Sequence, residues 1–437
     1  MDTPTLLVIF GITGDLSRRK LIPAIEQIAK AGALPAHFRL IGVTRRAVSP
    51  EEVLKGIDAP YVRSHLTMRQ MDLASLADYR QLASGLDDMA RDMGVAAQRL
   101  FYLSVPPQIS RPIVELLGQS GLAKQPRAKL LLEKPFGTDL ASAEELVAQT
   151  RQYFGESQIY RIDHYLAKEM AQNLIVFRQG NSLFKRTWNK NFIEKIDIVA
   201  SEKIGIEGRA AFYEQTGALR DLVQSHLLQL AALTLMTTPK GSNLSTVPEN
   251  RLRALEQLRI DPAKPVFGSV VRGQYAGYRD EVGDQKSNTE TFVDLRLQSA
   301  DPAWEGVPIR LITGKALDAK TTEIRITYKK DEDFEANQLV ITFQPDEGVD
   351  VYLWTKVPGY SWKMEQHSLH LAFKDHFDAL PEAYEQVLVD AMRSSHTLFT
   401  SSDEVLASWR IIQPVQEAWE MSADDLVLYE PGSGIDL

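Results

Sequence analysis

Residues 5–32 read TLLVIFGITGDLSRRKLIPAIEQIAKAG and contain the pattern that decides the fold. Thr5–Phe10 is a continuous apolar run, which is typical of a strand buried on both faces of a parallel sheet. A glycine-containing turn follows at once, and apolar side chains then recur at helical spacing as far as Gly32. Pro23 suits only the first turn of a helix, so the regular helix is expected to begin near Lys20–Pro23. The stretch therefore predicts a strand, a tight turn and a helix in succession.

Further apolar runs alternate with helical stretches in the same way. They lie at Arg39–Val43, Leu100–Val105 and Lys129–Leu132. Alternation of strand and helix is typical of a doubly wound α/β domain with a parallel sheet. We therefore expect residues 1–165 to form a Rossmann-like dinucleotide-binding domain.

The pattern changes after this first domain. Helical stretches are expected at 167–179 and 217–236, the second long and amphipathic, and many strand-like runs fall within residues 265–375. A final helical stretch at 381–393 precedes a weakly patterned tail. Residues 166–437 are therefore expected to form an α+β domain with a large, mostly antiparallel sheet and helices.

Composition and charge exclude several classes of protein. The 437 residues are 44% hydrophobic and 24% charged, an ordinary globular balance. The net charge of −9 argues against a general nucleic-acid binder, which needs a basic surface. The chain has no cysteine, so disulfides and thiolate catalysis are excluded, and no set of residues has the spacing of metal ligands. No apolar run is long enough to cross a membrane and the N-terminus is a poor signal peptide, so a cytoplasmic protein is expected.

The turn after the first strand carries Gly11 and Gly14. Glycines let the backbone approach a pyrophosphate, and the following helix N-terminus offers unpaired N–H groups. A tight turn without a ligand has the same short pattern, but the position after the first strand of an α/β domain favours a dinucleotide site. Arg45 and Arg46 follow the second strand, with no carboxylate before Glu51. If the turn binds a dinucleotide, these arginines favour the 2′-phosphate of NADP over NAD; otherwise they are solvated surface residues.

A second charged cluster lies at residues 161–169, RIDHYLAKE. His164 and Lys168 are four residues apart and would share one face of a helix, where together with Arg161 they could bind a phosphate. The alternative is a solvated turn whose charges pair with one another. Lys134 ends a buried strand and is placed to contact a cofactor or substrate, unless it is an ordinary loop lysine.

His226 lies on the apolar stripe of the helical stretch 217–236. A histidine in such a place is usually a buried core residue, and this segment alone favours that interpretation. The alternative is a general base that a carboxylate orients. Asp221 is five residues earlier, about 140° away around an ideal α-helix. The two side chains are therefore not expected to pair, although both could border one substrate.

Several longer stretches occur together and in a fixed order. They are GITGDLSRRKLIPA (11–24), EKPFGTDL (133–140), QIYRIDHYLAKEMAQNL (158–174), IEGRAAFYEQTGALRDLVQSHLLQ (206–229) and WEGVPIRLITGKALD (304–318). Through these stretches the chain resembles the glucose-6-phosphate dehydrogenase family along almost its whole length. The pattern RIDHYLxKE is highly specific to that family.

The resemblance implies roles for individual residues. It assigns coenzyme binding to Gly11, Thr13, Gly14, Asp15, Leu16, Arg45, Tyr102 and Lys134. It assigns substrate binding to Lys20, Lys134, His164, Tyr165, Lys168, Glu207, Asp221, Lys315 and Lys320. It makes His226 the general base and Asp163 the carboxylate that orients it, which reverses the interpretation drawn from the local pattern.

The implied activity is oxidation of the C1 hydroxyl of glucose 6-phosphate to 6-phosphogluconolactone, with hydride transfer to NADP, as the first step of the oxidative pentose phosphate pathway. One alternative is a related dehydrogenase that uses another hexose 6-phosphate or NAD. The other is a non-catalytic regulatory paralogue, which the survival of the whole residue set disfavours. A homodimer or homotetramer is also implied, with oligomerisation through residues 166–437. Ala167 and Ser225 depart from the family's usual glycine and asparagine, and the family normally continues beyond Leu437.

Overall fold

The structure is a computed structural model that describes residues 3–125, 127–241, 243–330, 334–377, 380–422 and 424–436. The chain divides into two compact units. The first contains Met1–Ala167 and Pro381–Val405, and the second contains Lys168–Leu380 and Leu406–Leu437.

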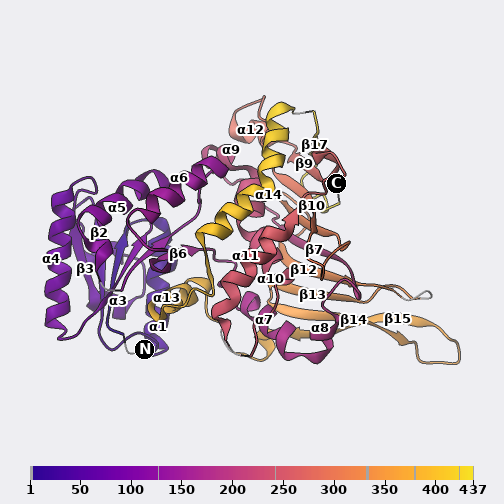
Figure 1. The fold of residues 1–437 in the computed structure, drawn as a ribbon, viewed down its shortest axis with the longest axis horizontal. Helices are drawn as coiled ribbons and strands as arrows, with labels where there is room; N and C mark the ends of the chain where they lie inside the picture. The colour runs from indigo at the N-terminus through magenta and orange to yellow at the C-terminus, as the bar shows by residue number, and fades with distance from the viewer. Residues whose placement is uncertain are drawn as a thin grey trace. The chain divides into compact units, whose positions relative to one another are not determined.

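A seven-stranded sheet forms the centre of the first unit, in the order β16-β6-β5-β4-β1-β2-β3 (Figure 1). Its strands are β1 (Thr5–Phe10), β2 (Phe38–Thr44), β3 (Leu66–Gln70), β4 (Gln98–Leu103), β5 (Ala128–Leu132), β6 (Ile159–Ile162) and β16 (Phe399–Thr400). All neighbouring strands are parallel except β16, which is antiparallel to β6. Every residue of β1 is buried, as expected for a strand covered on both faces. The strand order reverses between β1 and β4, and ligands bind to doubly wound sheets at such a point.

Helices cover both faces of this sheet. One face carries α1 (Ile22–Lys30), α3 (Pro60–His65) and α13 (Ala383–Arg393), which share a hydrophobic core with the strands. The neighbouring helices α4 (Leu76–Asp92), α5 (Pro107–Gln119) and α6 (Leu140–Arg151) form a second layer (Figure 1). The short elements are α2 (Pro50–Val53), η2 (Leu122–Lys124) and η3 (Glu156–Gln158). The predicted Rossmann-like architecture is confirmed.

The C-terminal segment Pro381–Val405 belongs to the first unit, whereas the sequence placed it in the second domain. The boundary also falls after Ala167 instead of Tyr165. Helix α13 packs against α1, and β16 extends the sheet beside β6. The apolar side of α13 is buried in the first core through Val387, Leu388, Ala391 and Met392. The periodicity of the sequence showed that this helix has an apolar face. Periodicity does not show which distant part of the chain covers that face.

A ten-stranded sheet dominates the second unit, in the order β15-β14-β13-β12-β7-β11-β10-β9-β17, with β8 beside β10 (Figure 1). Its strands are β7 (Ile193–Ser201), β8 (Leu258–Arg259), β9 (Val270–Tyr275), β10 (Phe292–Ser299), β11 (Ile309–Gly314), β12 (Thr321–Tyr328), β13 (Gln338–Gln344), β14 (Gly348–Lys356), β15 (Met364–Ala372) and β17 (Leu426–Tyr429). Only β7 with β11 and β9 with β17 pair in parallel among these described strands. The sheet is therefore mostly antiparallel, as predicted.

The second unit also contains several helical segments. They are α7 (Glu169–Gly180), α8 (Ser182–Thr187), α9 (Ala210–Ala218), η4 (Leu219–Leu227), α10 (Leu228–Leu235), α11 (Val247–Gln257) and α12 (Tyr278–Val282), with the 3-10 turns η5 (Leu244–Thr246), η6 (Val266–Gly268) and η7 (Phe373–Asp375). Helix α10 contacts α7 and α11, while η4 contacts β7, β10 and β11. Helix α14 (Ser402–Met421) begins in the first unit and continues in the second.

The predicted helix at 217–236 is present, but it is not amphipathic throughout. It begins after Gly217, whose φ of 64° separates it from α9, and it runs through η4 into α10. Every residue of α10 is buried, and α7 and α11 pack against it. The weakly patterned tail after residue 393 forms α14, a helix that the sequence pattern had not predicted. Pro414 inside α14 interrupts the sequence pattern without ending the helix.

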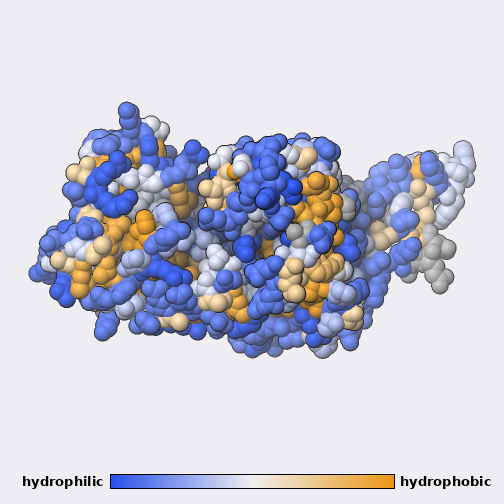
Figure 2. All heavy atoms as spheres, turned by 90° about the horizontal axis from the view of Figure 1, so that it is seen from above, coloured by the Kyte–Doolittle hydropathy of each residue, from blue (hydrophilic) through white to orange (hydrophobic). Residues whose placement is uncertain are grey.

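Hydrophobic side chains are concentrated in the interior. The face drawn in Figure 2 is mostly hydrophilic, with hydrophobic residues in separate patches. Within the described ranges, no helix is both long enough and apolar enough to cross a membrane.

Candidate active site

The glycine turn closes tightly against the end of β4. Gly11 has a φ of 83°, and a Cβ atom added to it would lie 2.2 Å from the Ser104 carbonyl oxygen. The Gly14 N–H donates to the Gly11 carbonyl at 2.9 Å, and the Ser17 hydroxyl donates to the same carbonyl at 3.0 Å. Thr13 lies in the turn and is half-buried. Only glycine fits the first of these positions, and the turn lies where the strand order reverses, as a dinucleotide site requires.

The helix after the turn is π-helical at its start. This segment, η1, spans Ser17–Leu21 and continues as α1 from Ile22. Pro23 occupies the first turn of α1, so the predicted start near Lys20–Pro23 is confirmed. π-Helical turns are rare and often occur at functional sites. Nothing in the residue pattern had indicated this one.

Asp15 and Lys20, two candidate residues at the start of this helix, make weak contacts at the surface. Asp15 pairs with Arg19 at 2.8 Å, and Lys20 pairs with Glu382 at 2.8 Å, all with exposed side chains. Exposed pairs of this kind contribute about 0–1 kcal/mol, so a ligand can displace them easily. Leu16 packs against the hydrophobic core and fixes the position of the turn.

The end of β2 presents two arginines to solvent. Thr44 is buried, while Arg45 and Arg46 are exposed. Their side chains have no ion pair or hydrogen bond with any residue that the structure describes, and Gln70 holds only the Arg45 carbonyl, at 3.3 Å. Both guanidinium groups therefore remain available to an anionic ligand.

A half-buried acid, Glu133, follows the end of β5, next to Lys134. The Tyr102 hydroxyl donates a short hydrogen bond to the Glu133 carboxyl, and the Tyr102 side chain is buried. Burial raises the pKa of Glu133 to about 7, although Tyr102 and Lys134 act in the opposite direction. Lys134 and Glu133 line a cavity of about 350 Å³. Tyr102 is therefore buried and reaches the cavity only through Glu133. The sequence analysis did not single out Glu133.

The turn that follows β6 is held by Asp163. Its Oδ1 accepts the Tyr165 N–H at 2.9 Å, and its carbonyl accepts the Leu166 N–H at 3.1 Å. A turn in which an Asp side chain accepts a hydrogen bond from the backbone N–H two residues later is called an Asx-turn. The His164 and Tyr165 rings meet edge-to-face at 5.0 Å. Asp163, His164 and Tyr165 therefore form one compact turn.

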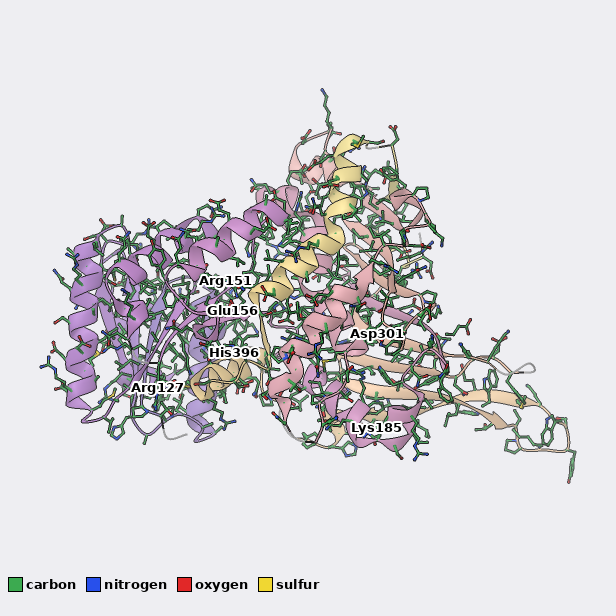
Figure 3. All side chains as sticks on the ribbon, in the orientation of Figure 1. Arg127, Arg151, Glu156, Lys185, Asp301 and His396 are labelled. Atoms are coloured by element: carbon green, nitrogen blue, oxygen red, sulfur yellow. The ribbon has the colours of Figure 1, made fainter. Side chains whose placement is uncertain are left out.

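Arg161 does not join this group as the spacing had suggested. Its side chain is buried, and Nη1 donates to Glu156 Oε1 at 3.1 Å. Glu156 also accepts the Ser402 N–H at 2.7 Å and contacts Arg151, which lies beside it in Figure 3. All four residues of β6 are buried, so Arg161 lies in the interior of the first unit instead of at an open surface. Its role is to anchor β6 to the start of α14.

Lys168 begins the second unit in a polar cluster. Its Nζ donates to Gln344 Oε1 at 2.8 Å, and the Gln344 amide donates to the Thr322 hydroxyl at 2.8 Å. Burial lowers the pKa of Lys168 to about 8, with Glu347 acting against this shift and Lys320 adding to it. Sequence reasoning found Lys168 and Lys320 but missed Gln344 and Glu347. The sequence offered one indication of these two residues: Gln344 lies at the end of a strand-like run, and Glu347 follows it.

Asp221 and His226 lie on the π-helix η4. Hydrogen bonding from i to i+5 widens the turn, so the separation of about 140° expected for an α-helix does not apply. Ser225 donates from its hydroxyl to the Asp221 carbonyl at 3.0 Å. His226 is buried and Asp221 is half-buried. That the side chains of Asp221 and His226 do not pair stays a prediction.

Lys315 is buried against acidic and aromatic groups. Its Nζ makes a short ion pair with Glu202 and lies 5.2 Å from the centre of the Tyr213 ring. Asp221 is among the carboxylates that raise the pKa of Tyr213, after burial itself. Glu202 and Tyr213 were not among the sequence candidates.

Two non-glycine residues near these groups have left-handed backbone conformations. Glu207 has a φ of 47° and Ala316, which follows Lys315, has a φ of 52°. Such conformations are uncommon and cluster at functional sites. One of these residues, Glu207, is itself a candidate for substrate binding, and the other follows the candidate Lys315.

The candidate residues divide between the two units. The coenzyme candidates, Lys20, Asp163, His164 and Tyr165 belong to the first unit. Lys168, Glu207, Asp221, His226, Lys315 and Lys320 belong to the second. The pairing of Asp163 with His226 stays a prediction.

Comparison with known proteins identifies the family. Residues 8–173 match the model for the NAD binding domain of glucose-6-phosphate dehydrogenase, and residues 175–434 match the model for its C-terminal domain. The chain belongs to the glucose-6-phosphate dehydrogenase family. The resemblance drawn from RIDHYLAKE and the other stretches is confirmed, and the first unit is a domain for a nicotinamide dinucleotide.

Individual members of the glucose-6-phosphate dehydrogenase family align over nearly the whole chain. Glucose-6-phosphate 1-dehydrogenase of Dickeya dadantii is 35% identical over 466 residues, covering 98% of this chain and 94% of that protein. The enzyme of the same name from Aggregatibacter actinomycetemcomitans is 37% identical, covering 98% and 93%. A solved glucose-6-phosphate dehydrogenase in complex with its substrate glucose-6-phosphate has a TM-score of 0.92 at 30% identity, covering 99% and 95%.

Proposed function

We propose that this protein oxidises the C1 hydroxyl of glucose 6-phosphate, with NADP as the hydride acceptor and 6-phosphogluconolactone as the product. The observation that carries the proposal is the full-length likeness, TM-score 0.92, to a relative that binds glucose 6-phosphate. The local chemistry supports it. The first unit offers a turn for a pyrophosphate, and the second offers lysines, carboxylates and a buried histidine.

His226 is the general base in this proposal. A neutral imidazole accepts the C1 hydroxyl proton near neutral pH, and the carboxylate of Asp163 stabilises the imidazolium that forms. The Asx-turn that uses Asp163 Oδ1 fixes the direction of its carboxylate. Bound NADP supplies the hydride acceptor. His164, Tyr165 and Lys168 hold the phosphate, while Glu207 and Asp221 accept hydrogen bonds from sugar hydroxyls.

Arg45 is expected to give the preference for NADP over NAD. A hydrogen bond to a charged group contributes about 1.5–3 kcal/mol, so Arg45→Ala should raise the KM for NADP roughly 10- to 150-fold. The KM for NAD, which lacks the 2′-phosphate, should change less than about twofold. Steady-state kinetics with both coenzymes measures this. Arg46→Ala is the matched control. The double variant shows whether Arg46 can take over the contact when Arg45 is missing. Equal effects of Arg45→Ala on the KM values of both coenzymes would contradict the assignment.

Binding of the phosphate is expected to weaken in alkaline solution. The pKa of Lys168 is about 8, against 10.5 for an ordinary lysine, so the ammonium group loses its proton as the pH rises through about 8. The buried charge of Lys168 lowers the free energy of unfolding below pH 8. This penalty disappears between pH 8 and 10.5, because the folded protein loses the proton in that range before the unfolded chain does. The KM for glucose 6-phosphate should therefore rise above about pH 8, while the KM for free glucose stays level.

Lys168→Arg is the matched variant for this effect, because arginine stays charged in this range. It should remove the alkaline rise even if its KM is higher throughout. A parallel rise in KM for glucose and glucose 6-phosphate would assign the titration to chemistry or folding instead of phosphate binding.

A panel of sugar phosphates, each supplied with NADP or NAD, tests the proposed substrate. Fastest reduction of NADP with glucose 6-phosphate supports it, whereas a faster reaction with another hexose 6-phosphate favours the sister activity. We further propose a cytoplasmic homodimer or homotetramer, which sedimentation of the purified protein tests.

A further inference from the structure

Glu347 lies beside the proposed phosphate site but has the wrong charge for binding an anion. It follows the end of β13, and its Oε2 accepts the Met170 N–H at 2.9 Å. Met170 is the second residue of α7, a helix of 12 residues that begins directly after Lys168. Helix N-termini attract anions, so the carboxylate of Glu347 occupies a position that would otherwise suit a phosphate.

The groups around Glu347 make its charge sensitive to a ligand. Lys168 favours the carboxylate, while Glu169 disfavours it. The charge of Lys320 acts on Lys168, whose pKa it lowers. Burial raises the pKa of Glu347 above its ordinary value, and the Met170 N–H and Lys168 oppose that shift. Asp346, next to Glu347, is neutralised by Lys374 at 3.1 Å.

Gln344 gives Lys168 a hydrogen-bond partner that does not titrate. Gln344 is held at both ends, since its oxygen accepts from Lys168 and its amide donates to Thr322. An amide carries no titratable proton, so this contact keeps its form at any pH in the experiment below. A phosphate bound by Lys168 would carry about two negative charges at neutral pH. The like charge of the Glu347 carboxylate would then oppose binding, unless Glu347 takes up a proton.

We propose that Glu347 takes up a proton from solvent when the phosphate of the substrate binds at Lys168. This inference rests on the proposed function, because it assumes a phosphate at that lysine. The proton adds to one carboxylate oxygen of Glu347, and the other oxygen keeps the Met170 N–H bond. The new O–H group becomes a hydrogen-bond donor to the phosphate. Glu347 thereby changes from a group that repels the ligand into one that binds it.

Proton uptake can be measured by calorimetry without following turnover. Glucose 6-phosphate, and separately inorganic phosphate, is titrated into the purified full chain at about pH 7 in two buffers that differ in ionisation enthalpy. At that pH the phosphate is already mostly a dianion, since its second pKa is about 6, and Lys168 is mostly protonated. We expect wild type to take up roughly half to one proton more per site than Glu347→Gln.

Two controls make the result specific. Asp346→Asn changes a neighbouring carboxylate that is exposed and paired with Lys374, so it should keep the wild-type uptake. His164 is present in every variant, so any contribution from its titration cancels. Glutamine preserves the acceptor for the Met170 N–H and should fold. Independently of any variant, infrared difference spectra of wild type should show a protonated carboxyl appearing when ligand binds.

The outcomes separate this inference from the proposed function. Uptake in Glu347→Gln equal to that of wild type, or no uptake and no carboxyl band in wild type, overturns the role of Glu347 even when glucose 6-phosphate is oxidised. Absence of any binding or oxidation of glucose 6-phosphate overturns both. Binding of inorganic phosphate with Glu347-dependent uptake, but oxidation of a different sugar phosphate, supports the role of Glu347 and corrects the substrate.

Discussion

His226→Asn should lower kcat by about 10²- to 10⁴-fold, the usual contribution of a positioned general base. Asparagine can still form hydrogen bonds at the buried site, so the KM for glucose 6-phosphate should change little. Adding Asp163→Asn should lower kcat only slightly further, because a base and the group that orients it act as one unit. Steady-state kinetics of the two single variants and the double variant measures this.

The competing interpretation is that His226 is an ordinary core residue. In that case His226→Asn would lower the temperature of unfolding while the folded fraction turns over at the wild-type rate. Gln229→Asn is a matched control, since Gln229 is a buried polar residue three positions further on. It should alter stability without altering kcat. A folded His226→Asn protein with wild-type kcat removes the base from the mechanism and leaves the fold unchanged.

Gly11→Ala should remove coenzyme binding and destabilise the fold severely. A Cβ atom at Gly11 would lie 2.2 Å from the Ser104 carbonyl oxygen, which is backbone and cannot swing away. A left-handed conformation costs a non-glycine residue about 1–2 kcal/mol, and overpacking costs about 1–3 kcal/mol more. A loss of roughly 2–5 kcal/mol in the free energy of unfolding is expected. Chemical denaturation and fluorescence titration with NADP measure the two effects.

Gly56→Ala separates the clash from the backbone strain. Gly56 has a φ of 79°, close to that of Gly11, but a Cβ atom added to it would meet no neighbouring atom within 4 Å. Its replacement should cost only about 1–2 kcal/mol and leave coenzyme binding intact. Equal losses for the two variants would show that the contact with Ser104 is unimportant.

The architecture was predictable where a local pattern determines it. The buried run Thr5–Phe10, the glycine turn and the helix beginning near Pro23 follow from periodicity and from what glycine and proline permit. The attachment of α13 to the first unit was not predictable, because its apolar face could have been buried by any core. Pro414 likewise hid α14, since proline inside a helix is usually disfavoured.

The candidate site was predictable in its residues but not in their surroundings. Arg161 looked like a phosphate ligand from its spacing, yet it lies in the fully buried strand β6 and pairs with Glu156. The π-helical form of η4 changes which residues share a side, and no residue pattern signals it. Contacts such as Tyr102 with Glu133 arise between strands and are set by sheet register.

The most direct test of the central claim follows reduced nicotinamide by its near-ultraviolet absorbance after glucose 6-phosphate and NADP are added to the purified protein. We expect a steady rise in absorbance that requires both compounds, and its rate should fall by about 10²- to 10⁴-fold in His226→Asn. No rise from a folded wild-type protein, with NADP or with NAD, would contradict the claim.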